Sequence, residues 1–450
     1  MLQDYDKAIQ TLESHLQDGP SVTLAGFIRS FHPGDIAYLA SHINQDYLKG
    51  FLDEVQLHPE LEEIIFLMEK EPTTQLVEAM PTSQIKDLFS KLDPDDSAKI
   101  IDQLPEELGI WALSHMQPED SKETESLLEH DKETAGRIMS PDFFAMDEES
   151  TVLEAFTALK TEHEAETVYA LLITDKRNHL VGVCSLRELL TQPNHKKLKE
   201  FMEEEVISVR ADLDREEVAH MVERYKLNVL PVVSKRNKIL GIITVDDVIQ
   251  VIRSEATEDI MKLAGTTEEE FALQSPLKGF QRRMPWLMVS FFGGILTIQT
   301  NIYFSGKIPQ VEFLAFITVI AGMGGNIASQ SSTIVVRGLA TGKILPSELW
   351  DVLYKEISIG VLLGLCFGAL LGTFASFQFQ HVPLIGFSVM AGMIFSMLIA
   401  ATVGSLMPLI FHKFQIDPAV ATGPFVSTTI DNLGLLGYFG SVFMIFHLFL

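Results

Sequence analysis

A single carboxylate stands in an otherwise apolar stretch near the C-terminal end of the 450-residue chain. The stretch reads VSTTIDNLGLLGYF, residues 426–439, and its carboxylate is Asp431. Hydroxyl side chains precede Asp431, and Pro424 lacks a backbone N–H, so we expect it to free a carbonyl near the middle of this segment. Such oxygen-rich surroundings suit a hard cation such as Mg²⁺, which often keeps most of its water. The alternative is a neutral or hydrogen-bonded Asp431 with a structural role.

A second polar run interrupts an earlier apolar segment, which reads ITVIAGMGGNIASQSSTIVVRGLATG (317–342). Its glycines and other small residues permit close helix approach or local unwinding. The polar side chains of the run are Asn326, Ser329, Gln330, Ser331, Ser332 and Thr333. They either hydrogen-bond neighbouring helices or line an ion path.

The elements that must position these groups are membrane helices. Apolar segments cover roughly residues 285–304, 311–336, 352–377, 384–411 and 418–450. Each has at least the ~20 residues that a helix needs to cross a bilayer. The alternative is a set of buried helices in a soluble domain. We predict a transmembrane domain of five helices over residues 282–450, in which an intramembrane Asp431 without a basic partner on its own or the preceding span indicates function.

Basic residues flank these segments unevenly, which predicts the orientation. Those on one side are Arg282, Arg283, Arg337, Lys343, Lys355 and Lys413, whereas Lys307 falls on the other side. We therefore expect the N-terminal part in the cytoplasm and, after five crossings, an extracytoplasmic C-terminus in a multi-pass plasma-membrane protein. The N-terminus lacks a basic region followed by an apolar core, so we expect no cleaved signal.

Charge is concentrated before the first apolar segment. The net charge is −27, and residues 1–279 hold 27 Lys/Arg against 55 Asp/Glu, whereas residues 280–450 hold seven against six. A part this acidic repels phosphates, so nucleic acid is excluded as a partner. It suits solubility, a basic partner or divalent cations.

Residues 1–132 are predicted to form an acidic α-helical domain. Prolines at 81, 94, 105 and 118 recur every 11 to 13 residues, each before an apolar-periodic run. Proline in a first turn beside acids is a helix-start signal, so the pattern predicts short antiparallel helices stacked in a superhelical domain. Asp93, Asp95 and Asp96 either cap a helix or meet a cation.

Residues 133–253 contain a duplicated unit, and each copy is predicted to read strand, helix, two strands, helix. The copies end in GVCSLREL and GIITVDDV, after starts that read IMSPDFFAM and FMEEEVISV. This α/β unit resembles a tandem CBS-domain pair. The resemblance implies an adenine nucleotide such as ATP in the cleft between the copies. No P-loop or kinase motif is present, so we expect neither ATP hydrolysis nor an enzyme.

The CBS resemblance also implies nucleotide ligands. The second copy matches the usual Gly, two apolar residues, Ser/Thr, two residues, Asp pattern with Thr244 and Asp247, whereas the first copy has Ser185 and Glu188. The further candidates for base or phosphate contacts are Tyr169, Arg187, Leu230 and Pro231.

Residues 254–281 are predicted to form a connecting helix between the CBS pair and the membrane. Glu255, Glu258 and Asp259 stand at i, i+3 and i+4, so they share one helix face. A divalent cation or a basic partner would relieve their repulsion. The alternative is a solvated acidic face.

The whole order, with the motifs GGNIASQSSTIVVRGLATG and DPAVATGPFVSTTIDNLGLLGYF, resembles the MgtE family of magnesium transporters and channels. The resemblance implies a homodimer with an ion path lined by the second and fifth spans, with Asp431 as pore carboxylate and Asn326 beside it. It implies feedback by cytosolic Mg²⁺, which bridges the acidic domains and closes the gate. The candidate sensor ligands are Asp93, Asp95, Asp214, Asp247, Glu255, Glu258 and Asp259.

The hypothesis is thus a passive, Mg²⁺-gated Mg²⁺ pathway. One alternative is transport of another divalent cation such as Co²⁺ or Mn²⁺, although oxygen ligands select poorly for softer metals. Another alternative is a nucleotide-responsive membrane receptor that conducts nothing.

Overall fold

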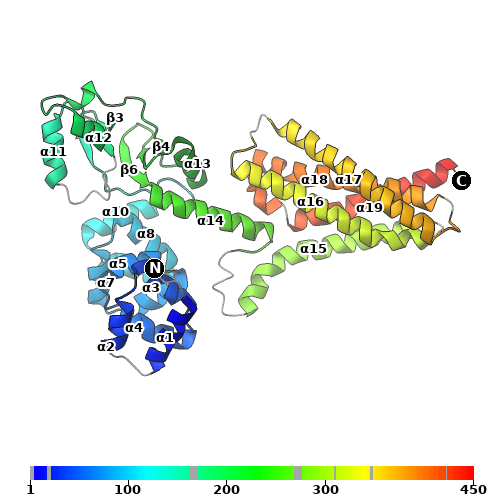
Figure 1. Ribbon diagram of the computed structural model, residues 1–450, viewed down its shortest axis with the longest axis horizontal. Helices are drawn as coiled ribbons and strands as arrows, with labels where there is room; N and C mark the ends of the chain where they lie inside the picture. Colours follow the sequence, from blue (N-terminus) through cyan, green and yellow to red (C-terminus); the bar gives the residue numbers. More distant parts are fainter. Residues whose placement is uncertain are drawn as a thin grey trace. The chain divides into compact units, whose positions relative to one another are not determined.

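The computed structural model describes residues 5–17, 22–161, 170–267, 276–308, 311–344, 348–382, 384–421 and 423–449. They fall into two compact units, Met1–Arg253 and Ser254–Leu450. Figure 1 labels most of the helices and several of the strands. Each unit has a hydrophobic core of its own.

Short helices form the first part of the chain, in blue and cyan in Figure 1, which confirms the helical prediction. They are α1 (Tyr5–Gln17), α2 (Val22–Ile28), α3 (Pro33–His42), α4 (Gln45–Val55), α5 (Leu61–Leu67), α6 (Lys70–Ala79), α7 (Thr82–Phe89), α8 (Pro94–Gln103), α9 (Glu106–His115) and α10 (Pro118–Leu128). The prolines mark their starts, because Pro94 and Pro118 are first residues and Pro81 and Pro105 are N-caps. Phe51 and Phe89 are fully buried in this core.

The predicted duplication is confirmed by two matching three-stranded sheets. The first copy comprises β1 (Ala145–Asp147), α11 (Val152–Thr161), β2 (Ala170–Thr174), β3 (Leu180–Ser185) and α12 (Leu186–Thr191). After the short helix η1 (Leu198–Glu200), the second comprises β4 (Val209–Arg210), α13 (Arg215–Tyr225), β5 (Val229–Val233), β6 (Ile239–Thr244) and α14 (Val245–Leu263). In each sheet the first two strands pair parallel and the last two antiparallel. Helix α14 continues without a break past the boundary predicted at residue 253.

The second unit consists of long apolar helices. They are α15 (Pro276–Ser305), η3 (Val311–Phe316), α16 (Ile317–Ala340), α17 (Leu349–Gln378), α18 (Ile385–Lys413), η5 (Pro418–Ala421) and α19 (Pro424–Phe449). Within the described residues, four candidate membrane spans are long and apolar enough to cross a bilayer: α15, η3 together with α16, α17 and α18. Helix α19 is not among these four, so the count of five crossings stays a prediction.

Helix α19 begins at Pro424, so the expectation that this proline interrupts a span near its middle was wrong. The short helix η5 precedes it. Proline fits the first position of a helix because the N–H that it lacks has no intrahelical acceptor there. Asp431 therefore lies two turns into a regular helix rather than beside a proline break.

Helices α17 and α18 meet along a row of glycines. The row on α17 is Gly360, Gly364, Gly368 and Gly372. A Cβ on Gly368 would lie 2.9 Å from the carbonyl oxygen of Met390, and one on Gly372 would lie 2.5 Å from that of Gly386. A Cβ at Gly364 would lie 3.0 Å from the backbone of Ile394, and one at Gly360 would lie 2.7 Å from the Cβ of Ala401, so the glycines let the two helices pack closely.

Candidate functional site

Asp431 lies half-buried on α19, next to the predicted polar helix α16. Gly324 of α16 faces the residue before Asp431, since a Cβ built on Gly324 would lie 3.6 Å from Cγ2 of Ile430. This distance is an ordinary van der Waals contact, so α16 packs against the turn of α19 that carries the carboxylate.

Asn432 anchors this turn of α19 to α15. Its amide nitrogen donates to the carbonyl oxygens of Thr428, at 2.8 Å, and Gly293, at 3.4 Å. Its side-chain oxygen is buried without a hydrogen-bond partner in the described chain. The sequence placed Asn432 in the polar stretch without a role, because the contact with Gly293 joins residues far apart in the chain.

The polar run of α16 divides between two faces of the helix. Asn326, Ser329, Gln330 and Thr333 stand at i, i+3, i+4 and i+7, and all four are exposed on this chain. We call these four the polar stripe. Ser331 and Ser332 are buried on the opposite side, where Ser331 donates to the buried Glu356 of α17. Ser331 therefore has the structural role of bonding a neighbouring helix, whereas an ion path along the polar stripe stays a prediction.

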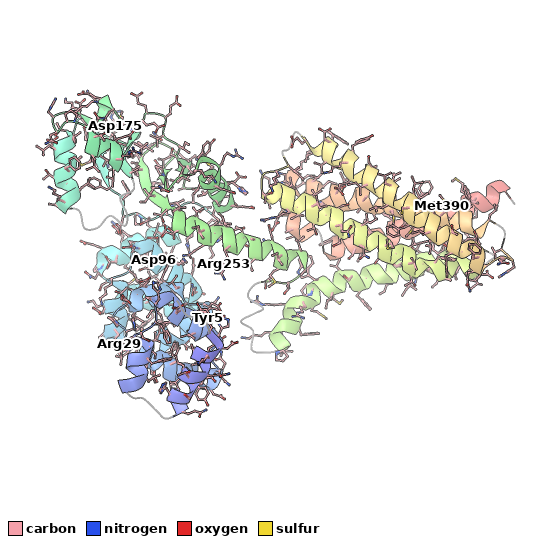
Figure 2. All side chains as sticks on the ribbon, in the orientation of Figure 1. Tyr5, Arg29, Asp96, Asp175, Arg253 and Met390 are labelled. Atoms are coloured by element: carbon pink, nitrogen blue, oxygen red, sulfur yellow. The ribbon has the colours of Figure 1, made fainter. Side chains whose placement is uncertain are left out.

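Several predicted sensor acids come together in the first unit. Asp96 of α8, which Figure 2 labels, interacts electrostatically with Asp93 beside it and with Asp246 and Asp247 in the first turn of α14. We call Asp93, Asp95, Asp96, Asp246 and Asp247 the acidic cluster. Asp93 occupies the N-cap position of α8 but makes no side-chain capping hydrogen bond. Nothing in the sequence indicated a role for Asp246, because the tertiary fold decides which residues of α8 and α14 face each other.

Burial shifts the protonation of the acidic cluster. It raises the pKa of Asp96 to about 7, although Lys99 opposes the shift. Burial likewise raises the pKa of Asp93 and of Asp247, and for Asp247 a hydrogen bond of 2.8 Å from the Thr244 hydroxyl opposes the rise. Burial disfavours the ionised form of these carboxylates, and a cation that binds beside them would stabilise that form.

One basic side chain enters the acidic cluster. The Lys99 ammonium on α8 donates to the side-chain oxygen of Gln250 on α14 and lies 3.8 Å from the centre of the Phe66 ring. It interacts electrostatically with Asp95, Asp96, Asp246 and Asp247. The sequence analysis gave Lys99 no role.

The remaining sensor candidates lie elsewhere. Asp214 is the N-cap of α13, where its carboxylate accepts from the backbone N–H of Glu216 at 2.8 Å, and the structure does not bring it to the acidic cluster. Glu258 pairs with Lys262, one turn along α14. Asp259 lies 4.0 Å from Arg337 of α16.

The end of α14 is tied to the loop before α19. Lys262 donates to Asp417 at 2.6 Å as well as to Glu258. Burial lowers the pKa of Lys262, but the hydrogen bonds to the two carboxylates more than offset it and raise that pKa above its ordinary value. Burial, with Asp417 nearby, raises the pKa of Asp259. Glu258 and Asp259 thus face intramolecular cations in this structure.

The candidate nucleotide ligands lie at matching ends of the two copies. Ser185 and Glu188 form a capping box at the start of α12, with Ser185 Oγ 2.9 Å from a Glu188 oxygen, as Thr244 bonds Asp247 in the second copy. Leu230 and Pro231 lie in β5, and Arg187 is exposed. Tyr169 lies outside the described residues.

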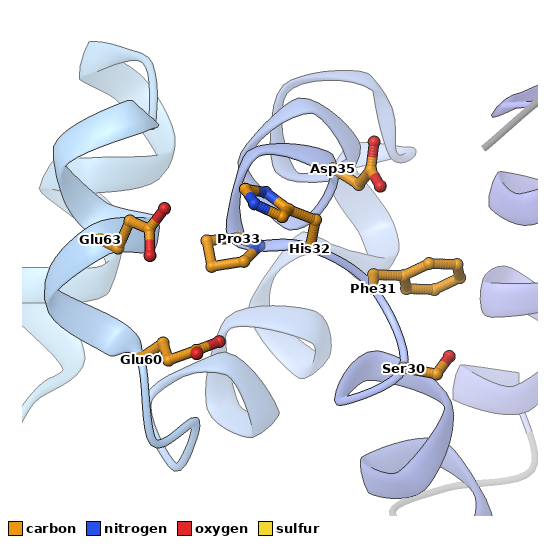
Figure 3. A pocket seen from close by; sticks show the side chains of 7 residues that line it. All are labelled: Ser30, Phe31, His32, Pro33, Asp35, Glu60 and Glu63. Atoms are coloured by element: carbon orange, nitrogen blue, oxygen red, sulfur yellow. The ribbon is translucent and has the colours of Figure 1, made fainter. Parts of the chain in front are cut away.

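A separate hollow of about 580 Å³ lies in the N-terminal helices, where the sequence predicted no site (Figure 3). It is lined by Ser30, Phe31, His32, Pro33, Asp35, Glu60 and Glu63. Asp35 accepts from the Tyr5 hydroxyl at 2.9 Å, and His32 caps α3. In the part of the chain that the structure describes, its acids and histidine do not converge into a group of three metal-ligand atoms within 4.8 Å.

Comparisons with known proteins cover both units. Residues 317–441 match the family model for a divalent cation transporter, MgtE. Residues 31–133 match the MgtE intracellular N domain, and residues 135–194 and 198–254 match the CBS domain.

Characterised relatives match over most of their length. The chain is 33% identical to the magnesium transporter MgtE of Bacillus subtilis over 353 residues, 78% of each chain. It is 36% identical to that of Enterococcus faecalis over 330 residues, 72% of each chain. A crystal structure of the cytosolic domain of the Mg²⁺ channel MgtE in complex with ATP matches 54% of this chain and 99% of that one, with 28% identity and a TM-score of 0.50. The chain therefore belongs to the MgtE family of magnesium transporters, membrane proteins with an intracellular N domain and a CBS pair.

Proposed function

We propose that this chain forms a passive Mg²⁺ pathway as a homodimer in the plasma membrane, and that cytosolic Mg²⁺ closes it. The polar stripe on α16 carries this proposal. In a lone chain it would face hydrocarbon, where polar groups without partners are costly. A second copy of the chain, with a water-filled path between the two, removes this cost.

The carboxylate of the pathway is Asp431. It lies on α19, which packs against α16 at Gly324 and Ile430. Two copies of Asp431 and Asn326 around one axis offer oxygen ligands to a hydrated Mg²⁺. The membrane potential supplies ~2.3 kcal/mol per charge per 100 mV, roughly 4.6 for a divalent ion, so uptake needs no other energy source.

Gating rests on the acidic cluster and on the acids of α14. At low cytosolic Mg²⁺ the carboxylates repel one another, and bound Mg²⁺ draws the N-terminal helices and the CBS pair together. The cluster joins α8 to the first turn of α14, and the same helix carries Glu255, Glu258 and Asp259 further along. Binding at the cluster therefore acts on a helix that leads toward the membrane unit.

ATP binds at the CBS pair without being hydrolysed in this proposal. The support is the shared Ser/Thr–acid arrangement of Ser185 with Glu188 and Thr244 with Asp247, together with the ATP complex of the relative's cytosolic domain. The orientation follows from the basic residues, with cytoplasmic N-terminal domains, five crossings and an extracytoplasmic C-terminus.

Uptake in a cell that lacks its own magnesium transport tests the pathway. We expect the wild-type chain to restore growth at low Mg²⁺ and Asp431→Ala to abolish the rescue while remaining in the membrane. Thr373→Ala, at an exposed hydroxyl on α17 outside the proposed path, is the matched control and is expected to retain rescue. Failure of a folded wild-type chain to rescue would favour a non-conducting, nucleotide-responsive receptor. Competition by Co²⁺ or Mn²⁺ in the same assay tests the other divalent cations as substrates.

A further inference from the structure

Lys99 links the two parts of the cytosolic unit, Met1–Arg253, which are the N-terminal helices and the CBS pair. Its ammonium lies over the Phe66 ring, 3.8 Å from the ring centre, and donates to Gln250 on α14. A cation that contacts an aromatic face and a fixed amide oxygen is held in place rather than free in solvent. The contact therefore links the N-terminal helices to the CBS pair.

The charges around this ammonium are those of the proposed Mg²⁺ sensor. The carboxylates of Asp95 and Asp96 on α8, and of Asp246 and Asp247 on α14, interact with it electrostatically. Burial lowers the pKa of Lys99, and the four carboxylates oppose that shift. The positive charge of Lys99 in turn stabilises the ionised form of these carboxylates. The Lys99 ammonium opposes the rise in pKa of both Asp96 and Asp247.

We propose that Lys99 is a built-in counter-ion of the acidic cluster, which holds α8 to α14 in the absence of metal and competes with Mg²⁺ for the same carboxylates. This inference rests on the proposed function, because it concerns the sensor of that pathway. A divalent cation that binds Asp96 or Asp247 must do so beside a fixed positive charge, which weakens its binding. Lys99 thereby sets the Mg²⁺ concentration at which the cytosolic unit responds.

The test uses the full chain in detergent micelles, with trypsin digestion measured across a MgCl₂ titration. Lys99→Met keeps an apolar stem over Phe66 and removes the charge, and Lys99→Arg keeps the charge. Lys91→Met is the matched control, because the ion pair of Lys91 with Asp87, at 3.4 Å, is exposed to solvent. Lys99→Gln serves as a second neutral variant if Lys99→Met fails to fold.

We expect Lys99→Met to be cleaved faster than wild type without Mg²⁺ and to reach half-maximal protection at an about tenfold lower Mg²⁺ concentration. Lys99→Arg and Lys91→Met should follow wild type. A wild-type response with the same midpoint in Lys99→Met and Lys91→Met would overturn the role of Lys99 alone. A wild-type chain whose protection does not change with Mg²⁺ would overturn both the proposed sensor and this inference.

Discussion

Ser331 donates a hydrogen bond of 2.7 Å to Glu356, and both side chains are buried between α16 and α17. Glu356 is 4% exposed, and this hydroxyl is its one hydrogen-bond partner in the described chain. The pair fixes the buried face of α16, opposite the polar stripe, against its neighbour. Because Glu356 is buried with a single hydrogen bond among the described residues, loss of that bond would leave its carboxyl group unsatisfied, which costs stability.

We predict that Glu356→Ala lowers the free energy of unfolding by about 1–3 kcal/mol, because it leaves the Ser331 hydroxyl buried without its acceptor. Glu356→Gln keeps an acceptor oxygen and should cost clearly less. Ser331→Ala should also destabilise, whereas Ser358→Ala, which removes an exposed bond within α17, is the control. Thermal unfolding in detergent measures each variant. Equal effects of Ser331→Ala and Ser358→Ala would contradict the importance of this pair.

The ion pair of Lys262 with Asp417 should be measurable by a double-mutant cycle. Asp417→Asn keeps the acceptor for the backbone N–H of Ala419, so it removes charge without removing the cap. We expect Lys262→Met and Asp417→Asn to couple by about 0.5–1 kcal/mol, because both groups are partly exposed. The coupling should shrink in ~1 M salt. Thermal unfolding of the four forms gives the coupling, and additive effects would show that the pair contributes nothing.

The glycine row on α17 predicts a contrast between two Gly→Ala changes. A Cβ at Gly368 meets the Met390 carbonyl oxygen at 2.9 Å, whereas a Cβ at Gly294 on α15 meets nothing within 4 Å. We expect Gly368→Ala to destabilise by about 1–3 kcal/mol and Gly294→Ala to be neutral or slightly stabilising. Detergent-solubilised yield and melting temperature measure both. Similar melting temperatures for the two variants would mean that α17 and α18 can separate at little cost.

The acidic cluster predicts a pH dependence in metal-free protein. The pKa of Asp96 rises from 3.8 to about 7 on folding, so the folded chain binds this proton more tightly than the unfolded chain does. The stability that this proton contributes is complete below the unfolded pKa and is lost as the pH rises through about 7. The raised pKa values of Asp93 and Asp247 add to this loss, and Lys99 reduces it.

Metal-free thermal unfolding from about pH 5 to about pH 8 checks this dependence. We expect the melting temperature of the cytosolic unit to fall over this interval, and Mg²⁺ to restore it at the upper end. Asp96→Asn should flatten the profile, whereas Asp87→Asn, at an exposed acid on α7, should leave it as in wild type. An unchanged slope in Asp96→Asn would assign the titration to other groups.

Local signals predicted the elements of the fold, because they depend on neighbours in sequence. Pro94 and Pro118 begin helices wherever the chain folds, since proline suits a first turn. The likeness of GVCSLREL and GIITVDDV predicted two copies of one unit. In the structure Ser185 and Thr244 each bond an acid three residues further along the chain. Hydrophobic length predicted the long helices. The prediction that Pro424 interrupts a span was wrong, because the effect of a proline depends on where its helix starts.

Tertiary partners could not be predicted in the same way. Asp96 and Asp247 were visible as acids, but nothing in their spacing says that α8 faces the first turn of α14, or that Lys99 reaches Gln250. Glu356 was counted only as one charge, because its partner Ser331 lies on another helix. The assignment of Asp431 to the ion path stays a prediction, since its test requires the second copy and the ion.

The glycine row also limits which helices can move during transport. At Gly364, Gly368 and Gly372 a Cβ would lie 2.5–3.0 Å from backbone atoms of α18, so little side-chain volume separates the two helices there and sliding or rolling in small steps is hindered. The two helices should travel as one rigid body. A Cβ on Gly404 of α18 would meet the backbone of Ala328 on α16 in the same way, at 2.5 Å, so α16 belongs with α17 and α18. In the proposed pathway, widening and narrowing would then come from α15 and α19, whose contacts include the side chains of Thr428, Ile430 and Asn432. Helices α16, α17 and α18 would form the fixed part of this domain.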